Sequence, residues 1–257
     1  MKRLAVLVFV IFFSALGATQ ALELPKCPSN KWLNWSNCKG TQTYDSGDVY
    51  VGEFKNWERH GQGTFTSASG DTYVGEWKKG KPHGHGIINI LKKINYVGGF
   101  KDGEYHGQGK YTHADGENYV GTFKEGRFSG QGFWMSKGGE SYAGEFKEGK
   151  FSGQGIMSID NETIYNGESY VGEFKDGKFS GQGVWKSRNR TKYVGEFKNG
   201  RPYGQGNWTS SDGKKYVGEF KEGKIIGKGT MKYISGSRYF AEFIGDKFNG
   251  IVWTSNK

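Results

Sequence analysis

Aliphatic side chains are scarce in this chain. Hydrophobic residues account for 34% of its 257 residues, and aromatic residues alone account for 16%. The remaining aliphatic residues are too few to build the thick core of an ordinary two-layer domain. The sequence also lacks a Gly-Lys-Ser/Thr phosphate-binding motif and a Gly-x-Ser-x-Gly nucleophile elbow. We therefore expect neither a conventional globular core nor a catalytic domain.

Long hydrophobic runs are also missing. The longest, from Leu4 to Leu16, follows Lys2 and Arg3 and leads into small residues. It is shorter than the ~20 residues that cross a bilayer. The pattern predicts a signal peptide over residues 1–21, cleaved near Ala21, and an exported protein that is periplasmic or secreted. An uncleaved anchor is the alternative. Cleavage would lower the formal net charge from +10 to +8, so the mature chain is basic.

What the chain has in abundance is a strict repeat. Nine units begin at tyrosines, and seven of the eight intervals between these tyrosines are 23 residues long. The exception contains an insertion near residues 158–169. Such a period is typical of repeat arrays, and it predicts nine repeats over residues 50–257. The opening tyrosines are Tyr50, Tyr73, Tyr96, Tyr119, Tyr142, Tyr170, Tyr193, Tyr216 and Tyr239.

Each repeat alternates in a way that predicts a strand. We number positions from the opening tyrosine as zero. Position two is glycine in eight of nine copies, and position four is always aromatic. Because strand side chains alternate between faces, Tyr, Gly and Phe share one face, and Val, Glu and Lys share the other. The sequence YVGEFKDGKFSGQGVW, from Tyr170 to Trp185, is representative.

A second strand follows a tight turn. Positions six and seven read Asn-Gly, Asp-Gly, Glu-Gly or Lys-Gly in seven copies, and such pairs favour two-residue type I′ hairpins. An uninterrupted hairpin would place position four opposite nine, two opposite 11 and zero opposite 13. Position 11 is glycine in all copies and position 13 in eight. We therefore expect each tyrosine ring to lie over bare backbone.

The predicted fold class is all-β: an elongated single-layer antiparallel sheet of tandem β-hairpin repeats, twisted or groove-shaped. At ~4.8 Å per strand, nine repeats would extend about 85 Å. The phrases YVGEFKNG and KFSGQG resemble the membrane occupation and recognition nexus (MORN) repeat. The resemblance covers residues 50 to about 253. It implies this fold, but it says little about function.

Both cysteines lie in the segment 22–49, which we expect to be a cap with a degenerate repeat. Counting back one period from Tyr50 puts Cys27 at position zero and Cys38 at position 11. Diagonal neighbours of this kind are ~7 to 8 Å apart, beyond the ~4.4 to 6.8 Å of a disulfide. We nevertheless expect a disulfide between them in a distorted cap, favoured by export. Two free thiols are the alternative.

Neither histidine nor glutamate forms a convincing reactive cluster. Three histidines occupy position ten of consecutive repeats, about 9.6 Å apart, which is too far to share a zinc ion. The glutamates at position three have identical surroundings in each repeat, whereas acid–base catalysis needs two unlike carboxyl groups. We expect solvated residues, no metal, no cofactor and no enzyme. The histidines are His60, His83, His85, His106 and His113.

Two sets of residues are candidates for binding. Basic and aromatic residues near the start of the second strand could contact a membrane or a partner, although the rings could instead pair with position four: Arg127, Phe128, Lys150, Phe151, Lys178, Phe179, Arg201 and Tyr203. The aromatic face could form a groove: Tyr119, Phe123, Trp134, Tyr142, Phe146, Tyr170, Phe174, Trp185, Tyr193, Phe197 and Trp208.

The leading functional hypothesis is an exported, non-catalytic scaffold that binds a protein partner or an envelope surface. An anionic-lipid binding module is the alternative. Glycan recognition on Trp134, Trp185 and Trp208, which would require these rings to be exposed, is a third. We expect no nucleic acid partner, because the chain is exported; self-association through the sheet face or edge is a further option. In a eukaryotic host, four sequons would become relevant: Asn34, Asn161, Asn189 and Asn207.

Overall fold

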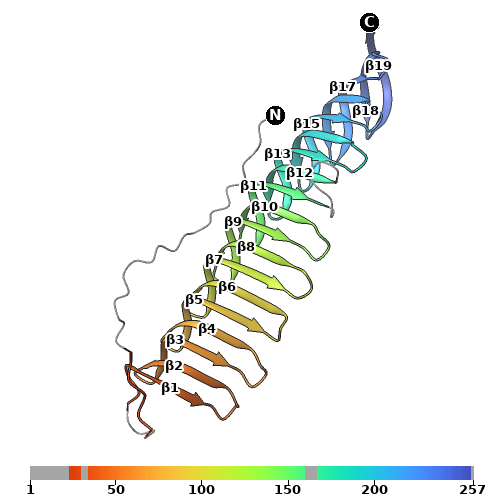
Figure 1. Cartoon of the computed structure of the whole chain (residues 1–257). Coiled ribbons are helices and arrows are strands. Elements are labelled where there is room, and N and C mark those ends of the chain that lie inside the picture. Colours follow the sequence, from red (N-terminus) through yellow and green to blue (C-terminus); the bar gives the residue numbers. More distant parts are fainter. Residues whose placement is uncertain (1–22, 30–33, 160–166, 256–257) are drawn as a thin grey trace, which may run out of the picture.

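The structure, a computed structural model, describes residues 23–29, 34–159 and 167–255. The expected signal peptide therefore lies outside the described residues. The described chain forms one antiparallel sheet in which each strand pairs with the strands before and after it (Figure 1). The strands are β1 (Cys38–Thr43), β2 (Val49–Lys55), β3 (Glu58–Thr66), β4 (Thr72–Lys78), β5 (Lys81–Ile90), β6 (Ile94–Lys101), β7 (Glu104–His113), β8 (Asn118–Lys124), β9 (Arg127–Met135), β10 (Ser141–Lys147), β11 (Lys150–Ser158), β12 (Ser169–Lys175), β13 (Lys178–Lys186), β14 (Lys192–Lys198), β15 (Arg201–Thr209), β16 (Lys215–Lys221), β17 (Lys224–Lys232), β18 (Arg238–Ile244) and β19 (Lys247–Ser255).

The predicted all-β, single-layer array of hairpins is confirmed. Every hairpin from β2–β3 to β18–β19 turns through positions six and seven, and both of these residues have positive φ, as a type I′ turn requires. The turn of one repeat also bonds to the repeat before it: the Gly200 N–H donates to the Phe179 carbonyl at 2.9 Å. In the first turn Trp57 takes the usual glycine place, with φ 67°.

The register beyond the turn differs from the prediction. Position four faces nine as expected, for example Phe174 opposite Phe179, but position two faces 13, and position zero faces 15, as Tyr170 faces Trp185. Positions 11 and 12 form a bulge that pairs only with the next repeat. The sequence-based register was wrong by two residues because it assumed an unbroken ladder, which a bulge interrupts.

Glycine at position 11 serves this bulge rather than the tyrosine. Its φ is between 53° and 71° in the first eight repeats, a region that side chains other than glycine rarely adopt. The glutamate at position three folds over it: a Cβ on Gly181 would lie 2.2 Å from the Glu173 carboxylate. Glu173 also accepts a hydrogen bond from the Gln182 N–H at 3.3 Å. The glutamates expected to be solvated thus help to hold the bulge.

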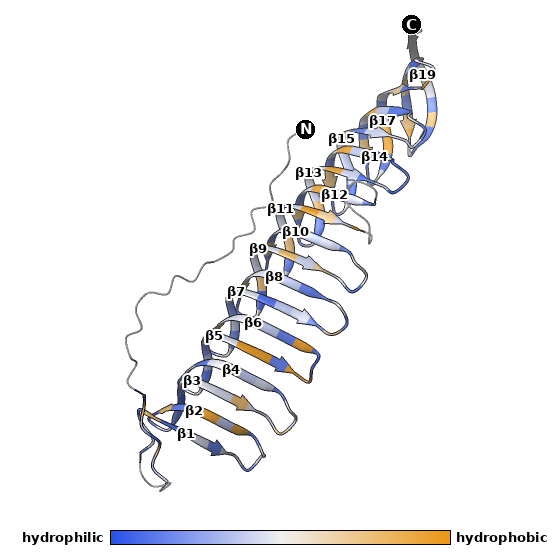
Figure 2. Ribbon diagram, in the orientation of Figure 1, coloured by the Kyte–Doolittle hydropathy of each residue, from blue (hydrophilic) through white to orange (hydrophobic). Residues whose placement is uncertain are grey.

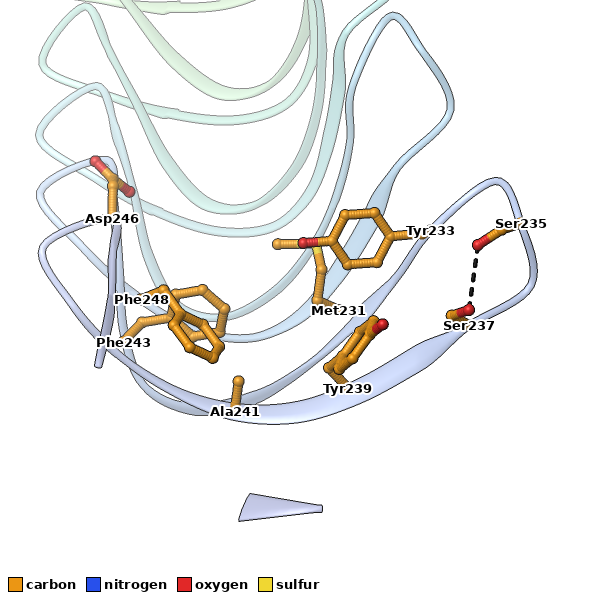
Figure 3. A pocket seen from close by; sticks show the side chains of 9 residues that line it. All are labelled: Met231, Tyr233, Ser235, Ser237, Tyr239, Ala241, Phe243, Asp246 and Phe248. Carbon is orange, nitrogen blue, oxygen red and sulfur yellow. Dashed lines mark hydrogen bonds between the residues drawn. The ribbon is translucent and has the colours of Figure 1, made fainter. Parts of the chain in front are cut away.

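The tyrosine rings do lie over bare backbone, on the glycines at positions two and 13. A Cβ on Gly172 would meet the Tyr170 hydroxyl at 2.7 Å, and one on Gly183 would meet it at 2.3 Å. The expectation was therefore correct for the rings, although the glycine across the strand is not the directly paired residue. With a bulge in each hairpin the sheet curls, and in Figure 3 the ribbons of successive repeats form nested U-shaped curves.

The inside of this curve is filled by aromatic rings. Position-nine rings stack on the tyrosine of their own repeat, as Phe179 stacks on Tyr170 with centroids 3.9 Å apart. Tyr170 also meets Phe197 of the next repeat edge-on at 4.9 Å. Tyrosine and position-four rings are accordingly buried in every repeat from Tyr50 to Phe220. A single layer has a core because consecutive repeats cover each other's rings.

The N-terminal end follows the repeat phase with a different first half. Cys38 faces Phe54 and Gly40 faces Gly52, as positions 11 and 13 face the next repeat elsewhere. The structure joins Cys27 to Cys38 in a disulfide with 4.9 Å between their Cα atoms. This is shorter than the diagonal distance in the expected hairpin, because residue 26 forms a parallel bridge with residue 39.

The insertion leaves the sheet regular. β11 and β12 pair in the register of the other repeats, from Gly153 opposite Phe174 to Ser158 opposite Ser169. The Ile159 N–H then bonds to the Glu168 carbonyl at 2.8 Å. Ser158 and Ser169, the last paired residues on either side of the insertion, thus lie at the strand ends opposite the hairpin turns, and residues 160–166 lie outside the described part.

Candidate binding surfaces

The tyrosine hydroxyls have a structural task. Tyr170 Oη donates to the Glu173 carbonyl at 3.0 Å and lies 3.1 Å from the Ser180 carbonyl. These two carbonyls belong to the positions at which the bulge interrupts the pairing. Burial raises the pKa of Tyr170 to about 12. The hydroxyl thus stays protonated and satisfies backbone groups, which explains why this position holds tyrosine rather than phenylalanine.

The predicted aromatic groove is not an open binding groove. Its tyrosines and phenylalanines are at most 5% exposed, because the curled sheet and the neighbouring repeats cover them. The eight residues to which this correction applies are Tyr119, Phe123, Tyr142, Phe146, Tyr170, Phe174, Tyr193 and Phe197.

Trp134, Trp185 and Trp208 are half-buried and pack against this core. The indole N–H of Trp134 donates to Glu117 at 2.9 Å, and that of Trp185 donates to Glu168 at 3.0 Å. The indole N–H groups of two of these three tryptophans are therefore already hydrogen-bonded within the chain. Stacking on a flat sugar ring would require faces that are more open than these.

The predicted basic and aromatic pairs are split between the two faces. Phe128, Phe151 and Phe179 stack on tyrosines inside the curve. The preceding cations, Arg127, Lys150 and Lys178, are exposed at the hairpin turns. Ring and cation cannot act together at one membrane surface, because neighbouring residues of a strand point to opposite faces. The structural pairing weighed in the sequence accounts for these rings.

Arg201 and Tyr203 are arranged differently. Pro202 occupies position nine of their repeat, opposite Phe197, and Tyr203 faces Glu196. The Tyr203 ring is half-buried, and Lys198 Nζ lies 4.8 Å from its centroid. Arg201 is exposed. Among the predicted basic and aromatic residues, Tyr203 is the ring for which a contact with a cation of its own hairpin, Lys198, is seen.

The outer face combines an apolar stripe with basic edges. Most position-one valines are exposed, 51% in both Val51 and Val217. Positions five and eight, directly opposite each other next to the turn, are mostly lysine or arginine, and hydrophilic segments recur where the strands turn (Figure 2). Val120 and Val171 show the same exposure in the middle of the array, 49% and 43%. The accessible surface of the rod is thus this outer face and its edges.

The acidic residues and histidines of the described chain form no cluster of metal ligands. In the part of the chain that the structure describes, no three metal-ligating side chains come together. His83 and His85 lie near Asp102 and Glu76, at 3.7 and 3.9 Å. Within residues 23–29, 34–159 and 167–255 there is no helix long and apolar enough to cross a membrane.

A cavity of about 520 Å³ lies in the last hairpin (Figure 3). Met231, Tyr239 and Phe243 line its floor, and the Ser235 and Ser237 hydroxyls bond to each other at 3.2 Å on its rim. It is the continuation of the filled aromatic interior, left open because no further described repeat covers it. Phe248, at position nine, is accordingly 57% exposed there.

The fold and these surfaces define an elongated repeat protein: one curled sheet of bulged hairpins with an aromatic interior. The MORN repeat family model matches it eight times, so the chain belongs to the MORN repeat family. The matches cover residues 50–72, 73–88, 96–117, 119–140, 142–163, 170–192, 193–215 and 216–238. MORN repeats are generally non-enzymatic binding or scaffold modules. The β18–β19 hairpin continues the pattern beyond the last match.

Other comparisons add little. No curated protein matches the sequence. Among solved structures, selenomethionine-substituted virginiamycin B lyase from Staphylococcus aureus is similar at 10% identity, with 82% of this chain and 87% of that chain covered. The TM-score is 0.17, so this likeness carries no argument about fold or activity.

Sequence reasoning missed the bulge and the three groups that support it. These are the glycine at repeat position 11, the glutamate at repeat position three and the hydroxyl of the opening tyrosine. One feature could have revealed them: position zero is tyrosine in all nine copies, never phenylalanine. A purely apolar role would not need the hydroxyl. It also missed Trp35, whose ring stacks parallel to Trp57 at 6.0 Å and whose carbonyl accepts from the Trp57 N–H at 2.9 Å.

Proposed function

We propose that this protein is an exported, non-catalytic scaffold that binds a partner protein or an envelope surface along its exterior. The observation that carries this proposal is that the residues that recur from repeat to repeat build the interior of the sheet. Tyr, Gly, Glu and Phe of the repeat build the bulge and the core. What is free to bind is the regular outer face, repeated along a long rod, which suits an extended partner.

Two features support export. The first 21 residues have the pattern of a signal peptide. Cys27 and Cys38 form a disulfide, a bond that persists mainly in oxidising compartments. A fusion of residues 1–21 to a reporter that is active only outside the cytoplasm tests this part. Activity that is abolished by replacing Lys2, Arg3 and the apolar run is the expected result.

Site-specific photocrosslinking tests the scaffold. A crosslinker at Val171 or Val217, both exposed on the outer face, should give the same adduct in native envelope material. A crosslinker at Phe174, buried inside the curve, is the matched control and should give none. Adducts from the inner position, or none from the outer positions, would contradict the proposal.

Binding to an anionic membrane is a second candidate, favoured by the exposed cations at positions five and eight. Such cations attract anionic headgroups, although stable binding usually requires an apolar anchor as well. Pelleting with anionic vesicles at low salt tests it. If the protein stays in the supernatant, the membrane candidate is excluded while the scaffold proposal stands.

A further inference from the structure

Cations face each other across the strands at the hairpin turns. In each hairpin position five is directly opposite position eight, so Lys175 faces Lys178 and Lys198 faces Arg201. Like charges at directly opposed positions destabilise a sheet. Five consecutive hairpins have this arrangement, and we call their ten side chains the tip cations: Lys124, Arg127, Lys147, Lys150, Lys175, Lys178, Lys198, Arg201, Lys221 and Lys224.

Other hairpins of the same chain pair a lysine at position five with a glutamate at position eight, which leaves no net charge. Lys55 faces Glu58 in the first hairpin, and Lys101 faces Glu104 in the third. A glutamate at position eight is thus compatible with the fold and gives an attractive cross-strand pair. The five hairpins from β8 to β17 have lysine or arginine at position eight instead of glutamate. Folding therefore does not require the tip cations, and an external anion is the natural source of compensation.

Among the described residues, no ion pair includes a tip cation. All ten tip cations are exposed. The only Lys–carboxylate pair of the described chain is Lys214 with Asp212 at 3.0 Å. Lys198 contacts the Tyr203 ring, a cation–π contact that leaves its charge in place.

Neighbouring turns leave clefts that bring cations of two repeats together. A cavity of about 240 Å³ is lined by Lys124 and Arg127 of one repeat and Lys147 of the next, together with Glu125, Glu148, Phe128 and Ser129. A second, of about 500 Å³, is lined by Lys198, Arg201 and Lys221, together with Asn199, Tyr203 and Glu222. Each cleft holds three cations, against two carboxylates in the first and one in the second.

The hairpin turns that carry the tip cations recur along a line. Equivalent positions in adjacent repeats are two strands, or about 9.6 Å, apart. The insertion does not interrupt the line, because β11 and β12 pair in the same register as the other repeats. The tip cations therefore form a row of five cationic steps that a linear chain of negative charges can follow.

A flat bilayer fits this row less well than a linear polymer does. The strands at the two ends of the array run in clearly different directions in Figure 1, so the row winds about the long axis. The rings next to the cations, Phe128, Phe151 and Phe179, point inward and stack on tyrosines, so they cannot enter a membrane interface. A flexible polymer can follow a winding row and needs no apolar anchor.

We propose that the tip cations bind an extended, flexible polyanion whose charges are phosphate groups. The inference rests on the proposed scaffold function and names the chemistry of its partner. Eight of the ten cations are lysines, which act as point charges without demanding a fixed geometry. Binding should therefore depend on chain length and salt rather than on the sequence of the polymer.

Fluorescence anisotropy with labelled long-chain inorganic polyphosphate tests the proposal on the mature full-length chain. The ladder variant R127E/K150E/K178E/R201E/K224E converts five tip pairs into the Lys–Glu pairs that the chain itself uses. We expect its affinity to fall by roughly 100-fold or more, and the dependence of affinity on salt concentration to become shallower. Tripolyphosphate, which reaches only one or two clefts, should compete poorly with the long chain.

A matched variant controls for net charge. K110E/K137E/K186E/K215E/R238E makes the same change in charge at exposed residues away from the hairpin turns. We expect its affinity to fall by no more than about threefold, since long-range charge effects are screened by salt. Circular dichroism of both variants should match the parent, and the ladder variant should melt at no lower a temperature, because its Lys–Glu pairs replace repulsive ones. This separates a loss of binding from a loss of fold.

Three outcomes would overturn the inference. They are equal losses in the two variants, no binding of polyphosphate by the parent chain, or binding to anionic vesicles that depends on the tip cations while polyphosphate is ignored. The outer-face crosslinks at Val171 and Val217 are the independent readout. If they persist in the ladder variant after any of these outcomes, the polyanion inference fails and the scaffold proposal stands; if they are absent from the parent, the scaffold proposal itself fails.

Discussion

The hydroxyl of Tyr170 donates a hydrogen bond to the carbonyl oxygen of Glu173, three residues further along the same strand, at 3.0 Å. The same hydroxyl lies 3.1 Å from the carbonyl of Ser180 on the partner strand. One side chain thus spans the bulge that gives the sheet its curvature. Because the interaction recurs from repeat to repeat, for example in Tyr142 and Tyr193, the curvature is set one repeat at a time.

Replacing Tyr170 with phenylalanine should destabilise the array by about 1–2 kcal/mol. The ring would still fill its place, but the part-buried carbonyls of Glu173 and Ser180 would lose this donor, and a polar group shielded from water without a partner is costly. Chemical denaturation of the variant measures the change. Tyr203→Phe is the control, because that ring is half-buried on position ten, and its unfolding midpoint should stay close to that of the parent.

Replacing Gly183 with alanine should cost more, about 2–3 kcal/mol. The added Cβ would lie 2.3 Å from the Tyr170 hydroxyl and 2.6 Å from two ring carbons, and the buried ring cannot move away, which is overpacking of a filled core. Gly250→Ala is the matched change, since no heavy atom lies within 4 Å of its Cβ. Equal melting temperatures for the two variants would refute this role of the glycine.

Alkaline pH should unfold the array cooperatively. Burial raises the pKa of Tyr119, Tyr142, Tyr170 and Tyr193 to about 12, against 10.0 for a free tyrosine. Between pH 10 and 12 the unfolded chain releases protons that the folded chain retains, so stability is complete below pH 10 and falls as the pH rises toward 12. Tyrosinate absorbance and circular dichroism, followed in parallel, should change together; ionisation that leaves the circular dichroism unaltered would contradict the burial.

Removing the disulfide should loosen one end of the array. Cys27 and Cys38 are 11 residues apart, and a closed loop of this size contributes about 2–3 kcal/mol. Because each repeat contacts only its neighbours, C27S/C38S should speed amide exchange in β1 and β2 and leave β12 to β17 unchanged. Hydrogen exchange with mass spectrometry resolves the two regions, and acceleration throughout the array would count against a local cap.

The stack of Phe179 on Tyr170 should contribute strongly to the interior. Phe179 also meets Phe174 at 5.5 Å and Phe197 at 6.0 Å. Its replacement by alanine would open a cavity shared by two repeats, at a cost of about 3–4 kcal/mol. Phe133→Ala is the control, because Phe133 is exposed on the outer face. If the two variants unfold alike, position nine does not belong to the core.

Much of the fold could be predicted because the hairpins are specified by residues that are close together in the sequence. The turn pairs such as Asp176-Gly177, the alternation of Tyr, Gly and Phe, and the 23-residue period each depend on a few neighbouring residues. The family resemblance agreed with them. The register of the hairpins could not be obtained in this way, because the bulge at Gly181 depends on contacts with Tyr170, Glu173 and the next repeat.

The candidate sites were harder to predict for the same reason. Alternation places the side chains of Phe128 and Arg127 on opposite faces of a strand, but it does not tell whether the aromatic face is open to solvent. Only the curl of the sheet and the ring of the following repeat decide that Tyr119 is buried. The pairing of position five with position eight follows from the turn alone, but the clefts that bring cations of two repeats together, such as Lys124 and Lys147, are visible only in the structure.

The sequence by itself determined that this chain is an array of β-hairpins in one layer, because a hairpin is specified by its turn and its alternation. The tertiary structure decided which surface is available. Curling a sheet turns one face into a core and leaves the other in solvent, and the curl arises from bulges that form only when two paired strands and the tyrosine between them are in contact.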